Sequence, residues 1–96
     1  MQKMNEYVIT IKYFALIREI TSKREEQVTL NEGKRIIDAL NKLIEIYGEK
    51  FSQNVFSGKK PKDNLTFLLN GQAVNDFQKY LKNGDILAIL PPISGG

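Results

Sequence analysis

The segment Ile86–Leu90 is apolar at every position, and it constrains the fold more than any other feature of the sequence. A strand that is apolar on both faces is usually buried in the middle of a sheet, often beside a parallel neighbour. Pro91 and Pro92 follow at once, and because proline has no backbone N–H, sheet pairing is expected to end at Leu90. The sequence therefore predicts a central strand that runs directly into the C-terminal residues 91–96.

Other segments predict the rest of a sheet. Tyr7–Phe14 and Glu26–Leu30 alternate apolar and polar residues, and the two are expected to pair as a hairpin. Leu65–Leu69 is a further strand, and Asn70-Gly71 after it favours a tight turn because both residues tolerate positive φ. A short return arm at 72–74 completes a predicted sheet of four to five strands.

Between Ile36 and Tyr47 the apolar spacing changes to three and four residues, which predicts one amphipathic helix. Gly48 stands where a helix C-terminal cap is wanted. Residues 15–23 are predicted as a connection, and residues 51–64 as a long surface loop with a short helical piece near its start. This order predicts an α+β fold of the β-grasp, or ubiquitin-like, architecture, with a mixed sheet and the main helix packed on one face. Residues 1–90 would form the domain and 91–96 a flexible tail.

Composition excludes several kinds of chemistry. The chain has neither cysteine nor histidine, so thiolate nucleophiles, disulfides and imidazole ligands are excluded, and no metal site or bound cofactor is expected. The net charge of +3 is scattered, and the one basic cluster, Lys59, Lys60 and Lys62, is interpreted as a solvated loop rather than a nucleic-acid site. Without a secretory start or a membrane-length apolar run, the protein is expected in the cytoplasm, with no membrane partner.

Alternation along the strands places apolar side chains on both faces of this sheet, and one helix can cover only one of the two faces. The apolar side chains expected on the second face are those of Val8, Phe14, Leu68, Ala88 and Leu90, joined by Ala73. An exposed contiguous apolar surface usually marks a partner site. The alternative is that the segment 51–64 folds over this face.

The tail Pro91-Pro92-Ile93-Ser94-Gly95-Gly96 is the candidate reactive element. Six residues reach about 20 Å when extended, far enough to enter another protein's active site. Two prolines stiffen its base, and Gly95 and Gly96 give a tip without side chains that leaves the terminal carbonyl open to attack. A carboxylate must first be activated with ATP, and because the chain has no phosphate-binding glycine loop, a separate enzyme would do this. Taken alone, terminal glycines are also common in chains where they have no function.

At this point the sequence resembles the family of the small, sulfur-carrier subunit of molybdopterin synthase, which includes the thiamine sulfur carrier. The stretch Phe14-Ala15-Leu16-Ile17-Arg18-Glu19 is similar to the family's Phe-Ala-x-x-Arg-Glu signature. Residues 83–96 resemble its Gly-Asp turn, apolar strand and Pro-Pro-x-x-Gly-Gly tail. The paired prolines and the chain length make the thiamine role less fitting than the molybdopterin role.

The resemblance implies a sulfur carrier of molybdenum cofactor biosynthesis. A ubiquitin-activating-type enzyme would adenylate Gly96, whose carboxylate then becomes a thiocarboxylate that donates sulfur to a pyranopterin precursor in the large synthase subunit. Gly95 would let the tip thread while Pro91 and Pro92 direct it, and Phe14, Ala73 and Leu90 match apolar family positions that dock on partners. The chain itself would not be an enzyme.

Three alternatives share some of these features. A ubiquitin-like modifier would use the activated Gly96 to form isopeptides with lysines, and a carrier for tRNA thiolation would need the same tail. A plain interaction module would use the apolar face alone. Arg18 and Glu19 are interpreted as a structural ion pair that fixes the bend after the first strand, with a functional role as the alternative.

Overall fold

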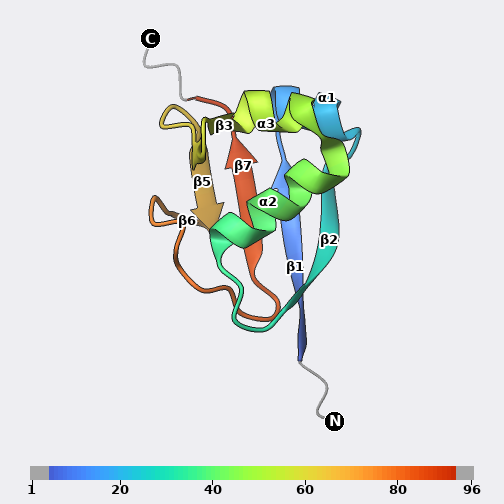
Figure 1. Ribbon diagram of the computed structural model, residues 1–96, viewed down its shortest axis with the longest axis vertical. Coiled ribbons are helices and arrows are strands. Elements are labelled where there is room, and N and C mark those ends of the chain that lie inside the picture. The colour runs from blue at the N-terminus through green and yellow to red at the C-terminus, as the bar shows by residue number, and fades with distance from the viewer. Residues whose placement is uncertain (1–4, 93–96) are drawn as a thin grey trace.

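The computed structural model describes residues 5–92 and shows helices packed on one face of a mixed sheet (Figure 1). The sheet has five strands in the order β2-β1-β7-β5-β6. Their bounds are β1 Glu6–Tyr13, β2 Glu25–Asn31, β5 Thr66–Leu69, β6 Gln72–Ala73 and β7 Ile86–Leu90. The helices are α1 Ala15–Thr21, α2 Ile36–Tyr47 and α3 Glu49–Val55, and a separate small hairpin is formed by β3 Phe56–Ser57 and β4 Lys60–Pro61.

The all-apolar strand β7 lies in the middle of the sheet, as predicted. It pairs in parallel with β1, with Ile11 opposite Leu87, and antiparallel with β5, with Phe67 opposite Ile89. Because β1 and β5 pair with its two edges, β7 has no free edge, which agrees with its continuous apolar sequence. The turn at Asn70-Gly71 is also confirmed, because both residues have positive φ between β5 and β6.

The predicted helix α2 has the expected bounds and lies across the sheet (Figure 1). The core forms between the two layers from side chains of β1, β7 and α2, among them Ile9, Ile11, Tyr13, Leu87, Ile89, Ile36, Ala39, Leu40 and Leu43. The backbone N–H of Arg35 donates to Asp38 Oδ2 at 2.7 Å, so the Asp38 carboxylate caps the start of the helix. Gly48 ends it at φ 77° and ψ −153°, a conformation that glycine adopts without strain.

Residues 15–23, predicted as a connection, contain the helix α1. Ile17 and Thr21, one turn apart, are buried and hold this helix against the core. Ser22, at φ 62°, ends it and donates its N–H to Arg18 O at 2.8 Å. This helix has only two turns, so its apolar residues recur too few times for the sequence to indicate a helix.

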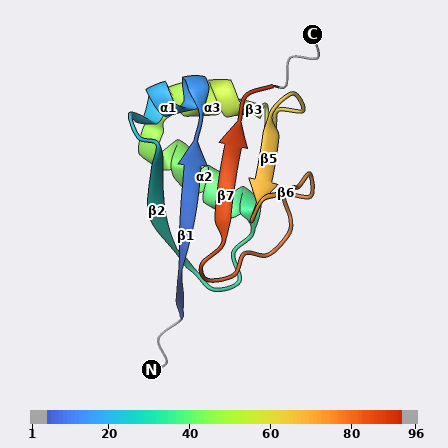
Figure 2. The ribbon, with the colours of Figure 1, turned by 180° about the vertical axis from the view of Figure 1, so that it is seen from behind.

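The short helical piece predicted near the start of 51–64 is confirmed by α3, but the prediction that this segment is a surface loop is wrong for much of its length. Phe51 and Val55 on α3 are fully buried, and Phe56 at the start of β3 is nearly so. The helix α3 lies against α1 and α2, on the same side of the sheet. The second face of the sheet is therefore left uncovered, as Figure 2 shows, and the alternative in which this segment folds over it is also wrong.

The carboxylate of Glu26 is the centre of a polar cluster beside the core. The hydroxyls of Tyr13 and Tyr47 both donate to its Oε2, Tyr13 at 2.5 Å, and Lys23 Nζ lies 3.1 Å from its Oε1. Burial acts to raise the pKa of Glu26, but the bonds from the tyrosines and Lys23 outweigh it and hold the pKa below its ordinary value. Burial and the bond to Glu26 raise the pKa of Tyr13.

Replacing Glu26 with glutamine is expected to lower the free energy of unfolding by about 2 kcal/mol at neutral pH, because hydrogen bonds to a charged acceptor are lost. A pKa lower in the folded than in the unfolded state means that this stabilisation is present above the ordinary value of 4.5 and is lost as the pH falls through the folded-state pKa. Urea unfolding at about pH 7 and about pH 3 checks this. The exposed Glu25→Gln is the control, and a Glu26→Gln deficit that is equal at both pH values would contradict the prediction.

Candidate functional site

The strand β7 ends at Leu90, and the two prolines that follow are exposed at the end of the sheet where α1 and α3 lie (Figure 1). Among the predicted tail residues, Pro91 and Pro92 are therefore placed at the surface. Ser94, Gly95 and Gly96 lie outside the described residues. The central strand thus leads the chain out of the core at one defined point.

A cavity of ≈ 210 Å³ lies beside this exit point, and we call it the tail cavity. Its lining brings the two prolines together with residues of α1, α3 and the segment before β5: Phe14, Ala15, Leu16, Ile17, Asn54, Lys62, Asn64, Leu65, Pro91 and Pro92. Its character is mainly apolar, with amide and ammonium groups among the lining residues. Phe14, which the sequence assigned to partner binding, thus lies at the base of the tail.

Arg18 holds Phe14 in place, and the predicted ion pair with Glu19 is absent from residues 5–92. The guanidinium of Arg18 lies 5.7 Å from the centre of the Phe14 ring, and its Nε donates to Tyr13 O at 3.4 Å. The ion pair found within the described range joins Lys23 to Glu26 instead. Neighbouring residues of a helix point in different directions, so Arg18 and Glu19 cannot face each other on α1.

The uncovered face of the sheet carries a lateral row of side chains across the four strands β1, β7, β5 and β6. The register places Lys12 beside Ala88, Ala88 beside Leu68, and Leu68 beside Ala73. Leu68 is half-buried and Ala73 exposed, whereas Ala88 is only 8% exposed. The side chain of Ala88 therefore lies lower than those of its two cross-strand neighbours, because it is small and they flank it.

Further apolar side chains extend this face along the strands. Leu90 is half-buried next to the tail, and Val8 is 39% exposed on β1, as the alternation predicted. Ile86 is also 39% exposed and was not predicted on this face. It could have been, because Ile86, Ala88 and Leu90 are alternate residues of one strand and their side chains share a face. We call the set Leu68, Ala73, Ile86, Ala88 and Leu90 the apolar face.

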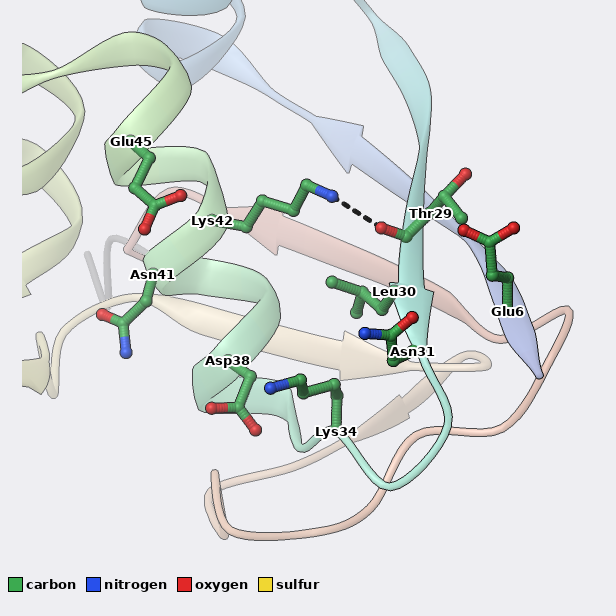
Figure 3. Close-up of a pocket in the computed structure, with 9 residues that line it drawn as sticks. All are labelled: Glu6, Thr29, Leu30, Asn31, Lys34, Asp38, Asn41, Lys42 and Glu45. Atoms are coloured by element: carbon green, nitrogen blue, oxygen red, sulfur yellow. Dashed lines mark hydrogen bonds between the residues drawn. The ribbon is translucent and has the colours of Figure 1, made fainter. Parts of the chain in front are cut away.

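A larger groove of ≈ 470 Å³ lies between α2 and β2 (Figure 3). Asp38, Lys42 and Glu45 of the helix line one side, and Lys42 Nζ donates to Thr29 O of β2 at 2.6 Å. The groove shares no lining residue with the tail cavity. Within residues 5–92 no three acidic, histidine or cysteine side chains gather as a metal site, and no helix has the length and apolar character needed to cross a membrane.

Comparison with known proteins gives consistent matches over most of the chain. The model of the ThiS family matches residues 11–96. A molybdopterin synthase sulfur carrier subunit of Chlamydomonas reinhardtii is 33% identical over 89 residues, which cover 92% of this chain and 98% of that protein.

Two solved structures are similar in both sequence and fold. A putative molybdopterin converting factor subunit 1 from Pyrococcus furiosus is 31% identical at a TM-score of 0.76, covering 91% of this chain and 99% of its own. The small archaeal modifier protein 1 of Haloferax volcanii is 26% identical at a TM-score of 0.80, with the same two coverages, 91% and 99%. The predicted β-grasp architecture is therefore confirmed.

Proposed function

This chain belongs to the ThiS family of ubiquitin-like sulfur carriers, and we propose that it is the sulfur-carrier subunit of a molybdopterin synthase. The observation that carries the proposal is the match to a sulfur carrier subunit over 92% of the chain. The tail agrees with it, because the central strand leads through Pro91 and Pro92 toward Gly96. In this role the carboxylate of Gly96 is the group that carries sulfur.

The chemistry requires a separate activating enzyme. Attack of the Gly96 carboxylate on the α-phosphorus of ATP forms an acyl adenylate and releases pyrophosphate. A sulfur nucleophile from a donor protein then attacks the acyl carbon, and AMP leaves as its oxygen takes the bonding electrons. With the terminal sulfur of a persulfide as this nucleophile, the product is an acyl disulfide. A thiol reductant then attacks its S–S bond on the donor's sulfur, which releases the thiocarboxylate and leaves the donor and the thiol joined as a disulfide. In this scheme the chain contributes the acyl group and no catalytic side chain, which agrees with its lack of cysteine and histidine.

The apolar face is the proposed docking surface for the large synthase subunit. Leu90 lies on β7, Leu68 on the adjacent β5 and Ala73 on β6 beyond it. A partner that covers all three also meets the base of the tail, because Leu90 directly precedes Pro91. The polar half of the same face, over β2, carries Gln27 and Thr29 instead. Docking on the apolar half would leave the tail directed along the partner's surface.

Replacing Leu68 with aspartate is expected to reduce sulfur transfer to the pyranopterin precursor at least about tenfold, because a charge in the centre of an apolar contact must be desolvated. Leu68 is only half-buried, so the variant is expected to fold. The rate of product formation with the large subunit measures the effect. Thr29→Asp places the same charge on the polar half of the same face and is the control. Equal effects of both substitutions would contradict the docking assignment.

Intact-mass measurement tests the function itself. The protein, its activating enzyme, ATP and a sulfur donor are incubated together, and the expected mass increase is that of one oxygen replaced by sulfur. Fragmentation should locate the change at Gly96. An unchanged mass under conditions in which a related carrier is loaded would refute the proposal.

A second candidate is a protein modifier, favoured by the similarity to the small archaeal modifier protein 1. Here an amine of a target lysine attacks the activated Gly96 and forms an isopeptide. Lysines that carry a Gly-Gly remnant after proteolysis, and that disappear when the gene is deleted, would support this role. The two functions use the same activation step, so this result would add to the mass measurement and not replace it.

A further inference from the structure

The segment 56–62, which we call the basic hairpin, presents three lysines on a fixed support. Phe56 and Pro61 are a register pair of the two short strands, and both are buried. The turn between the strands contains Gly58 at φ 67°. The N–H of Lys62 donates to Val55 O at 2.8 Å, so the end of the hairpin is tied to α3. The ammonium groups of Lys59, Lys60 and Lys62 therefore project from a rigid base.

The basic hairpin lies at the end of the sheet where the tail leaves the domain. Lys62 lines the tail cavity together with Pro91 and Pro92. Figures 1 and 2 show, from opposite sides, the loop before β5 next to the end of β7. Any protein that takes up the tail must approach this end and meet the hairpin.

Nearby carboxylates compensate the charge of the hairpin only in part. Lys59 and Lys60 are exposed, Lys62 is half-buried, and within residues 5–92 none of the three takes part in an ion pair. Lys59 and Lys60 line a further cavity of ≈ 410 Å³ together with Asp63 and Asp76. Three ammonium groups therefore stand near two carboxylates, and one net positive charge remains on this part of the surface. At low salt such a charge acts over about 10 Å or more. A positive patch of this kind raises the association rate with a negative one.

We propose that the basic hairpin is a second docking element, which takes an acidic surface around the tail-receiving site of the activating enzyme. The inference rests on the proposed function and adds to it the charge of the partner. Its physical role is to steer and orient the encounter, while the apolar face supplies contact area. Nucleic acid fits the hairpin less well, because such sites interleave lysines with exposed aromatic rings, and Phe56 is buried.

The test compares charge reversal at two ends of the same molecule. The double variant Lys59→Glu, Lys60→Glu leaves Phe56 and Pro61 in place, so the hairpin keeps its support. The matched control is Lys79→Glu, Lys82→Glu, which makes the same charge change at exposed lysines in the segment before β7, at the opposite end of that strand. Adenylation and loading of each full-length protein are followed as kcat/KM from about 25 mM to about 500 mM NaCl.

The hairpin variant is expected to lose about tenfold in kcat/KM at low salt through KM, with the loss falling below about twofold at high salt. The control is expected to lose less than about twofold throughout. Equal losses in both variants, or a loss that does not depend on salt, would overturn the inference while leaving the proposed function intact. Absence of loading of the unsubstituted protein would overturn both. Binding of a labelled RNA oligonucleotide that the hairpin substitutions remove would assign the lysines to nucleic acid instead and also overturn it.

Discussion

Deletion of Gly96 is expected to abolish thiocarboxylate formation and leave the folded domain unchanged. The terminal carboxylate would then belong to Gly95, one residue nearer to the base of the tail. A shift of one residue moves the reactive carbon by about 3.5 Å, and a displacement of about 1 Å can already cost about a hundredfold in rate. We therefore expect the rate of loading to fall at least about a thousandfold. Intact mass after incubation with the activating enzyme, ATP and sulfur donor measures it.

Two controls separate chemistry from stability. Ser94→Ala changes the tail without moving its end and should be loaded at close to the normal rate. Thermal unfolding of the deletion variant should match that of the unsubstituted protein, because the core is built from residues within 9–89. Normal loading of the deletion variant would show that the position of the terminal carboxylate is not critical and would contradict the prediction. Partner binding that survives the deletion, in a protein that is never loaded, would favour the interaction-module alternative.

Replacing Phe51 with alanine is expected to lower the free energy of unfolding by about 4 kcal/mol. The ring is fully buried and lies 6.1 Å, centre to centre, from that of Tyr47, so its removal leaves a cavity where α3 meets α2. Urea unfolding measures the change. In a protein of this size such a loss is a large share of the total stability.

The neighbouring exposed residue provides the control for this substitution. Gln53→Ala lies on the same helix and is expected to change the stability by less than about 0.5 kcal/mol. If Phe51→Ala were as mild as Gln53→Ala, residues 51–55 would behave as part of the surface segment that the sequence indicated, and not as a helix of the core.

The sheet and the main helix could be predicted because their patterns are long. Ile86–Leu90 lacks any polar position, and the stripe of α2 runs through three turns, so each has one natural place in a two-layer fold. The alternation in β1 likewise predicted a strand of the sheet, and the alternate residues Ile9, Ile11 and Tyr13 are buried in the core. Patterns that repeat several times outweigh local exceptions.

The short helix α1 was not predicted, and α3 was predicted as a short helical piece but not as part of the core, because their patterns are short. In α3 the buried pair Phe51 and Val55 is a single repeat among polar residues, which a loop would also allow. In α1 the residue that begins the helix, Ala15, has φ 51°, a conformation that its sequence gives no reason to expect. The role of Arg18 was missed because its partners are a ring and a backbone carbonyl, which charge pairing does not reveal.

The candidate site was predictable in part. Residues 91–96 were identified from proline and glycine chemistry alone, and their functional role stays a prediction. The apolar face followed from alternation, but Ala88 is nearly covered because a small side chain in a central strand lies below its neighbours. Lys62 lines the same cavity as the two prolines because of the way residues 49–62 fold, and the sequence did not indicate that arrangement.

The parallel pairing of β1 with β7 determines how the domain responds to mechanical force. The start of β1 and the end of β7 lie at opposite ends of the sheet, so tension between them loads their ladder in shear, with the hydrogen bonds sharing the strain. A motor that pulled on the carboxyl end would have to extract the central strand and disrupt the pairing on both of its sides at once. A protein whose end is gripped repeatedly by other enzymes would therefore be expected to survive each release still folded.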